Sequence, residues 1–224
     1  MAYPTYLELV NNVLNRLREP SVTVLSDDYS LLVGKFVNDT KREVEDAWNW
    51  SVLRKTLTIS VASADADNVY SLTNGSTIVG NNRTRILEAW NTTKKARMTE
   101  ITSAYLRQLT NTIPTQTGTP RYYCINSYDP AGVPEVTVWP KASASETLTF
   151  YLLVPQVELS GASDELYVPK DPVVQGAYLR AIIERGEDGG NMSDIQAQQY
   201  NNALSTAIAQ DAAFHDEEIT WLAN

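Results

Sequence analysis

The stretch Thr5–Arg18 reads TYLELVNNVLNRLR, and its apolar residues recur with the period of an α-helix. That period places the apolar side chains on one face of the predicted helix: Tyr6, Leu9, Val10, Val13, Leu14 and Leu17. A predicted helix that begins near Asp171 has the same kind of stripe: Val173, Val174, Ala177, Tyr178, Ala181 and Ile182. Neither helix has a sequence neighbour that could cover this stripe. We therefore expect the helices from the two ends of the chain to pack on each other.

A second helix is expected soon after the first, because Glu19-Pro20 ends the first and Ser26-Asp27-Asp28 offers N-cap residues. It should span about Tyr29–Trp48, with this apolar stripe: Leu32, Val33, Phe36, Val37, Thr40, Val44, Ala47 and Trp48. Gly34 either weakens this helix slightly or permits a close helix crossing. The charged residues are predicted to fall mostly outside the stripe: Lys41, Arg42, Glu43, Glu45 and Asp46.

Start signals also mark the helices at the other end of the chain. Asp171-Pro172 predicts an N-cap followed by proline at the first helical position. Ser193-Asp194 predicts the start of a last helix that runs to about Phe214.

Between the two helical parts, the hydrophobic period changes to two, which is typical of strands with one buried face. Leu57, Ile59 and Val61 alternate with hydroxyl residues, and Asp129-Pro130-Ala131-Gly132 predicts the turn of a hairpin. A short helix is expected at about Thr102–Leu109, and Thr110–Thr119 is expected to be a long exposed loop. The other predicted strands are Val69–Leu72, Arg85–Trp90, Lys95–Thr99, Arg121–Asn126, Glu135–Trp139 and Thr147–Val154.

These elements predict an α+β fold, with a helical bundle built from N- and C-terminal helices and an inserted antiparallel β domain. The bundle should comprise residues 1–52 and 156–224, including a C-terminal docking tail, and the β domain residues 53–155.

Composition limits the classes of function. The sequence contains no run of about 18 apolar residues, so it predicts no membrane span. The single cysteine, Cys124, excludes an intrachain disulfide. The net charge of −9 is uneven, because residues 51–150 carry 10 basic and 7 acidic side chains whereas residues 151–224 carry 3 and 12. This balance argues against tight nucleic-acid binding. The contrast between a basic middle segment and an acidic end could favour head-to-tail contacts between subunits. It is explained equally well if both segments are simply exposed to solvent.

Catalytic, cofactor and metal sites are not expected. His215 is the only histidine, and one histidine with one cysteine does not readily supply a zinc site. Asp65 and Asp67 lack the remaining ligands of a calcium loop. We therefore predict no enzymatic activity.

The C-terminal stretch is the candidate binding segment. It places large apolar residues beside acidic ones, and these residues either fold back onto the helices or enter a groove on another chain. The predicted partner-binding residues are Phe214, His215, Ile219, Trp221 and Leu222. If extended, Phe214–Asn224 could reach about 35–40 Å.

Several stretches resemble the head-to-tail connector adaptors of tailed bacteriophages, including the tail tubular protein A type of short-tailed phages. They are Tyr6–Val10, Val13-Leu14, Leu17–Pro20, Val37–Asp39, Ala47–Trp50, Val136–Pro140, Leu148–Tyr151, Val154-Pro155 and Leu166–Pro169. The resemblance covers most of the chain in order, and about Ala62–Thr119 has no counterpart in it.

The resemblance implies a non-enzymatic virion protein at the head–tail junction, which would be in the host cytoplasm during assembly. Such adaptors form homo-oligomeric rings, typically of twelve subunits, that bind the portal protein and carry the tail nozzle or another tail protein. DNA passes through their channel without sequence-specific binding. In this chain Phe214–Asn224 would bind the portal, and the acidic C-terminal third would help to keep the channel wall from adhering to DNA.

Two alternatives remain open from the sequence. One is another connector component, such as a head-closure or tail-terminator protein. The other is a glycan-binding or hydrolytic tail module that uses Trp90, Trp139 and paired carboxylates.

Overall fold

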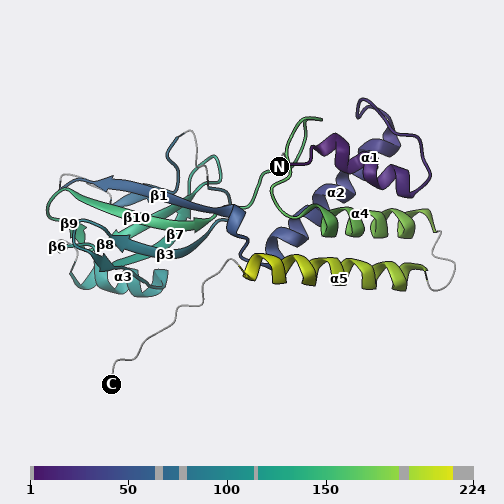
Figure 1. The fold of residues 1–224 in the computed structure, drawn as a ribbon. Coiled ribbons are helices and arrows are strands. Elements are labelled where there is room, and N and C mark those ends of the chain that lie inside the picture. The colour runs from purple at the N-terminus through teal and green to yellow at the C-terminus, as the bar shows by residue number, and fades with distance from the viewer. Residues whose placement is uncertain (1–2, 64–67, 76–79, 114–115, 187–191, 214–224) are drawn as a thin grey trace, which may run out of the picture. The chain divides into compact units, whose positions relative to one another are not determined.

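The computed structural model describes residues 3–63, 68–75, 80–113, 116–186 and 192–213. The chain divides into two compact units (Figure 1). The helical unit is built from both ends of the chain, Met1–Leu53 and Gln156–Asn224, and the β unit from the middle, Arg54–Pro155. The predicted α+β class is confirmed.

In the described residues the helical unit contains four α-helices: α1 (Tyr6–Arg16), α2 (Asp28–Ala47), α4 (Lys170–Arg185) and α5 (Met192–Ala212). Helix α1 begins with a capping box, in which the backbone N–H of Glu8 donates to Thr5 Oγ1 and the N–H of Thr5 donates to Glu8 Oε2. Helix α2 begins at the predicted cap, where Asp27 accepts from the N–H of Ser30 at 2.8 Å.

Helix α4 lies at the centre of the helical unit, in contact with α1, α2 and α5 (Figure 1). Its Gly176 permits this packing, because a Cβ atom there would lie 2.4 Å from Thr40 Cγ2 and 3.0 Å from the Tyr200 ring. Gly34 does the same for α1 and α2, since its Cβ would lie 2.2 Å from the Tyr6 hydroxyl. The expected packing of helices from opposite ends of the chain is therefore confirmed, as is a close helix crossing at Gly34.

Two details of these helices differ from the prediction. The N-cap of α4 is Pro169, without a side-chain hydrogen bond, so Asp171 lies inside the helix instead of capping it. Helix α5 is described from Met192 and therefore already includes Ser193, the predicted cap.

The described part of the β unit forms two four-stranded sheets, ordered β1-β10-β3-β4 and β2-β8-β7-β5, and a two-stranded pair, β6-β9. The pairing is antiparallel except for β5 with β7 and β6 with β9, two short parallel contacts that the sequence did not predict. The strand bounds are Arg54–Val61 (β1), Val69–Ser71 (β2), Arg85–Asn91 (β3), Ala96–Arg97 (β4), Thr99–Glu100 (β5), Thr117–Gly118 (β6), Tyr122–Tyr128 (β7), Pro134–Trp139 (β8), Lys141–Ala142 (β9) and Glu146–Leu153 (β10).

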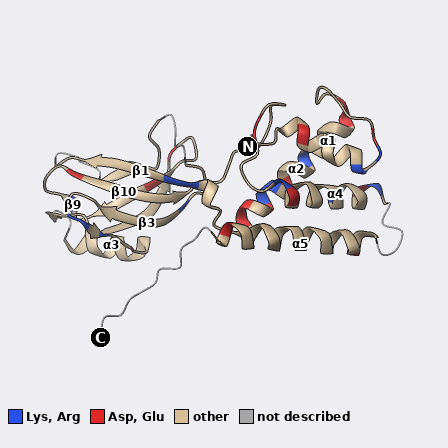
Figure 2. Cartoon of the chain, viewed as in Figure 1, with Lys and Arg blue, Asp and Glu red and all other residues tan. Residues whose placement is uncertain are grey.

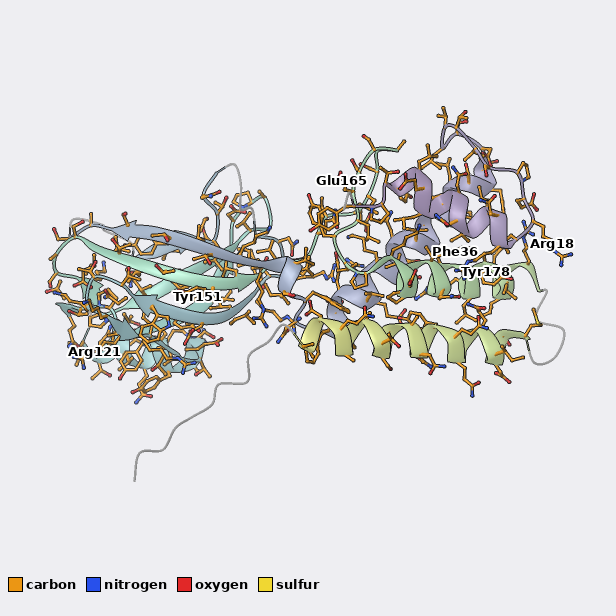
Figure 3. All side chains as sticks on the ribbon, in the orientation of Figure 1. Arg18, Phe36, Arg121, Tyr151, Glu165 and Tyr178 are labelled. Atoms are coloured by element: carbon orange, nitrogen blue, oxygen red, sulfur yellow. The ribbon has the colours of Figure 1, made fainter. Side chains whose placement is uncertain are left out.

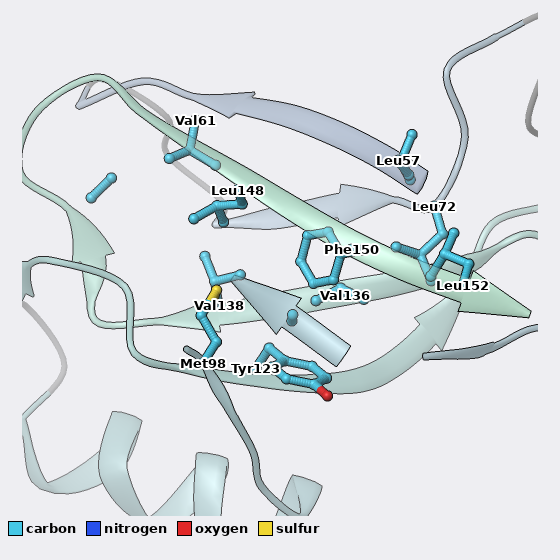
Figure 4. Packing of buried hydrophobic residues seen from close by; sticks show 12 residues of the cluster. Leu57, Val61, Leu72, Met98, Tyr123, Val136, Val138, Leu148, Phe150 and Leu152 are labelled. Atoms are coloured by element: carbon cyan, nitrogen blue, oxygen red, sulfur yellow. The ribbon is translucent and has the colours of Figure 1, made fainter. Parts of the chain in front are cut away.

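The two four-stranded sheets share one apolar core (Figure 4). Leu57 and Phe150 enter it from the first sheet, and Val136, Val138 and Tyr123 enter it from the second. The ring of Tyr123 meets the ring of Phe150 edge to face, with 5.9 Å between the centroids. The predicted hairpin is confirmed, because β7 and β8 pair antiparallel around Asp129–Gly132.

The predicted loop Thr110–Thr119 is wrong in part. Helix α3 (Ser103–Thr112) extends three residues into it, and the hydroxyls of Thr110 and Thr112 are satisfied there by carbonyls one turn earlier. Thr117 and Gly118 then form β6 against β9. Below α3, Leu106 packs with Cys124 and Trp139 in a small separate cluster.

Candidate partner-docking site

The five predicted partner-binding residues lie outside the described residues: Phe214, His215, Ile219, Trp221 and Leu222. The structure does describe the end of the helix that precedes them. The predicted segment begins directly after this end of α5, which is therefore the candidate docking site.

Asp211 fixes the last turn of α5 to the end of α2. Its carboxylate accepts hydrogen bonds from Trp48 Nε1 at 3.0 Å and from the Ser51 N–H at 3.2 Å, and the Ser51 hydroxyl donates to it as well. Three donors to one carboxylate make this a strong, charge-assisted contact. The sequence predicts Trp48 as the last residue of the apolar stripe of this helix, and no local pattern links it to a residue so distant in sequence.

A groove of about 330 Å³ lies between the first turn of α4 and the last three turns of α5. Its polar lining comes from Lys170 and Asp171 on α4 and from Asn202, Thr206 and Gln210 on α5, and prolines and alanines complete it. This groove could hold a short peptide segment, and its polar walls are unsuited to a large apolar ligand.

A buried ion pair holds the segment that re-enters the helical unit after the β unit. Lys41 Nζ lies 3.1 Å from Glu45 Oε1, and both side chains are almost fully buried. Lys41 also donates to the carbonyls of Gln156 and Val157 at 2.8 and 2.9 Å, and Glu45 accepts from the Gln156 N–H at 3.1 Å. The expectation that these two residues lie outside the buried stripe of α2 is therefore wrong. The sequence contains a signal for this pair, since Lys41 and Glu45 stand four residues apart and directly follow Thr40 and Val44 of the stripe.

Most of the exterior of helix α5 is uncharged, with the exposed Asp194 of its first turn as an exception. The sequence from Ile195 to Gln210 contains no lysine, arginine, aspartate or glutamate, and Figure 2 shows this helix without charged colour along most of its length. Its buried residues face α4, among them Tyr200, whose pKa burial raises to about 12. Its exposed residues are mainly amides and small hydroxyl residues, which hydrogen-bond without carrying charge.

The residues considered for other chemistry do not form a site. Trp139 is only 9% exposed beneath α3, whereas Trp90 lies in the other sheet, so the two do not form a joint glycan-stacking surface. Burial raises the pKa of the Cys124 thiol, which opposes nucleophilic reactivity. In the described part of the chain, no three His, Cys, Asp or Glu side chains come together as metal ligands would. His215, Asp65 and Asp67 lie outside the described residues.

None of the helices that the structure describes has both the length and the apolar character that a membrane span requires.

Comparison with known families identifies the chain. The family model described as SU10 adaptor protein matches residues 4–218, nearly the whole chain and both units. The chain belongs to the SU10 adaptor protein family. No curated protein matches it.

Membership in this family supports a bacteriophage adaptor protein that is part of the virion, and an adaptor is structural, which argues against enzymatic activity. The match does not distinguish the tail tubular protein A type within the phage adaptors. The match spans α1 to α5 and the whole β unit, so the insertion of a β unit into a helical unit belongs to the matched region.

Proposed function

We propose that this SU10-family adaptor forms a ring of twelve copies that joins the portal to the tail and surrounds part of the DNA ejection channel. The observation that carries the proposal is the family match over residues 4–218. The architecture supports it, because the two ends of the chain form one helical unit and leave a contiguous β unit for a second partner. In this proposal the helical unit binds the portal, and the β unit meets neighbouring subunits or the next tail protein.

The portal-binding segment is Phe214–Asn224, and the contacts of Asp211 support this assignment. They tie the last turn of α5 to Trp48 and Ser51, so the segment that follows starts from a defined position. Aromatic anchors commonly dominate the binding energy of an interface, which makes Trp221 the side chain expected to matter most.

Charge supports a channel through which DNA moves without adhering. The helical unit carries 8 basic and 20 acidic side chains, and the β unit carries 10 basic and 7 acidic ones. A net charge of −12 on the portal-binding unit repels DNA, and α5 carries no lysine or arginine that could pair with DNA phosphates. A solved ring with a basic lumen would overturn this part of the proposal.

Truncation after Ala213 tests the assignment. The purified full chain should co-sediment with the purified portal protein of the same phage, and the truncated chain should not, while its circular dichroism retains the helical signal. Replacing Trp221 with alanine should weaken binding about 30-fold, the effect of losing a central anchor of ~2 kcal/mol.

A variant with Asp216, Glu217 and Glu218 changed to their amides serves as the matched control, since it keeps the apolar residues of the segment. It should still bind the portal. Undiminished attachment of the truncated chain would remove the segment from the mechanism. Electron microscopy of the portal complex would test the ring, and a complex without an adaptor ring beneath the portal would reject the function itself.

A further inference from the structure

Three stretches of the helical unit that are distant in sequence lie side by side at its surface. The Leu166 N–H donates to the Pro4 carbonyl at 2.9 Å. The Tyr167 N–H donates to Gln156 Oε1 at 3.2 Å, and Gln156 Nε2 donates to the Glu165 carbonyl. These hydrogen bonds hold the chain before α1, the chain before α4 and the chain that follows the β unit together as one surface.

This surface exposes large apolar side chains. The rings of Tyr3 and Tyr167 meet edge to face, with 5.1 Å between their centroids, and both remain exposed. Val157 is 73% exposed, the highest fraction of any large apolar residue that the structure describes. Exposed aromatic side chains are enriched at protein interfaces and often anchor them. We call Tyr3, Val157 and Tyr167 the apolar patch.

The charges around the apolar patch are negative. Glu158 and Glu165 are exposed and adjoin it in the chain, and Figure 3 labels Glu165. The stretches that form the surface, residues 3–5 and 156–169, contain no lysine or arginine. Lys41 bonds to their backbone but is almost fully buried. A partner that docks on the apolar patch should therefore bring an apolar surface with a positive rim.

The β unit of this same chain has such a surface. On its first sheet, a hollow of about 460 Å³ has exposed apolar side chains and cations in its lining: Leu87, Tyr151, Lys55 and Arg97. Figure 3 labels Tyr151. Arg97 Nε lies 3.3 Å from Glu88 Oε1, and Lys55 adds a positive charge beyond this pair. The net charge of the β unit is +3, against −12 for the helical unit.

We propose that the apolar patch of one copy docks into this hollow on the β unit of a second copy, so that the two glutamates beside the patch meet the two cations of the hollow. The place of this contact in a ring rests on the proposed function. A contact between two different surfaces leaves one of each free on every pair, so it repeats from copy to copy and can close into a ring. Two apolar patches do not suit each other, because their glutamates would lie opposite one another.

Charge reversal tests this contact with the full chain. The variant Glu158→Lys/Glu165→Lys makes the patch surface positive, so it repels the hollow of another copy of the same variant. The variant Lys55→Glu/Arg97→Glu makes the hollow negative, with the same result. In a mixture of the two variants, the patch of each is again opposite in charge to the hollow of the other. All four side chains are exposed, so the fold should remain intact, which circular dichroism checks.

Sedimentation velocity of the natural chain should show concentration-dependent species that extend beyond a dimer. Each variant alone should self-associate at least about tenfold more weakly, and an equimolar mixture should associate like the natural chain. The control variant Glu184→Lys/Asp194→Lys makes the same charge change at exposed positions near the end of α4 and the start of α5, away from the apolar patch. It should associate like the natural chain.

A natural chain that stays monomeric at its highest soluble concentration, or stops at a dimer, would overturn the proposal. So would a mixture of the two variants that does not restore association, or a control variant that loses it. Loss of portal binding by Glu158→Lys/Glu165→Lys with unchanged self-association would assign the apolar patch to the portal instead.

The truncation test of portal binding does not depend on these results. A natural chain that assembles head to tail but does not bind the portal would reject the proposed function and retain the contact between copies.

Discussion

The helical unit and the β unit are stabilised by contacts of different range along the chain. All the strands of the β unit lie between Arg54 and Pro155, and its first and last strands are neighbours in one sheet. The helical unit instead joins α1 and α2 to α4 and α5, which follow more than a hundred residues later. An inserted unit can therefore be self-contained, whereas the unit that receives it depends on both ends of the chain.

Separating the two units gives the largest expected effect. The fragment Arg54–Pro155 should fold alone and unfold cooperatively in urea, because its core residues all lie within it. The fragment Met1–Leu53 should not fold, because α1 and α2 lose their contacts with α4. Circular dichroism and urea titration of both fragments provide the measurement.

Mixing the fragment Met1–Leu53 with the fragment Gln156–Asn224 is the useful control for this experiment. The mixture should regain helical structure, since it restores the contacts of α1 and α2 with α4. A fragment Arg54–Pro155 that stays unfolded would show that the β unit depends on the helices. The contrast between a self-contained β unit and a dependent helical unit would then be wrong.

The buried ion pair is the next most sensitive point, because it belongs to the long-range contacts of the helical unit alone. Lys41→Met removes the buried cation that lies 3.1 Å from Glu45 Oε1, together with two hydrogen bonds to the 156–157 backbone. The free energy of unfolding of the helical unit should fall by about 3–5 kcal/mol. Chemical denaturation followed by circular dichroism at 222 nm, where the helical unit dominates, measures this loss.

An exposed pair of the same unit is the matched control. Arg180 and Glu43 lie 3.0 Å apart, with 40% and 51% of their side chains exposed. Arg180→Ala should therefore change stability by less than ~1 kcal/mol. An equal loss for both variants would show that burial does not set the strength of these contacts.

The glycines test how closely the helices are packed. In Gly176→Ala the new methyl group meets Thr40, which is fully buried and bonded to the Phe36 carbonyl, so it has no room to move. The helical unit should lose about 1–3 kcal/mol of stability. Gly34→Ala meets only the hydroxyl end of Tyr6, and the better helix propensity of alanine, up to ~1 kcal/mol, offsets the clash.

Thermal unfolding of both variants measures the difference. The midpoint of Gly176→Ala should fall clearly below that of Gly34→Ala, which should stay close to that of the natural chain. The reverse order would mean that the α2–α4–α5 contact is looser than the structure indicates.

The sequence predicts those parts of this fold that are encoded by repeated local patterns. The stripes of α1 and α2, the alternation of β1 and the hairpin of β7 and β8 each follow from neighbouring residues. The contacts that define the candidate docking site do not. Asp211 meets Trp48 and Ser51 across about 160 residues, and nothing local marks that contact.

The wrong predictions also have physical causes that no local sequence pattern shows. Asp171 is a good N-cap type, but the helix begins at Lys170, two residues earlier than predicted. Pro172 is tolerated at the third helical position because the N–H that it lacks makes no backbone hydrogen bond within the helix there. The threonines that suggested a loop at residues 110–112 satisfy their hydroxyls inside α3. The burial of Lys41 and Glu45 is compensated by backbone groups at Gln156, which follow more than a hundred residues later in the sequence.

Acid should affect the helical unit more than the β unit, and this is the smallest predicted effect. The Ser30 hydroxyl and N–H hold the pKa of Asp27 below its ordinary value of 3.8, and the N–H groups of Ser160 and Gly161 do the same for Asp164. Both carboxylates belong to the helical unit. A depressed pKa in the folded state stabilises the protein above pH ~4, and this contribution is lost as the pH falls through the folded-state pKa.

The midpoint of urea unfolding of the helical unit should therefore fall between pH 5 and pH 3 more than that of the isolated fragment Arg54–Pro155. Asp27→Asn removes the titrating carboxylate but keeps the N-cap hydrogen bond, because asparagine also accepts that bond and does not titrate. This variant should retain most of its stability at pH 7 and lose less of it on acidification than the natural chain. If both chains lost the same stability, the acid sensitivity of the helical unit would lie elsewhere than at the start of α2, and Asp164→Asn would be the variant to compare next.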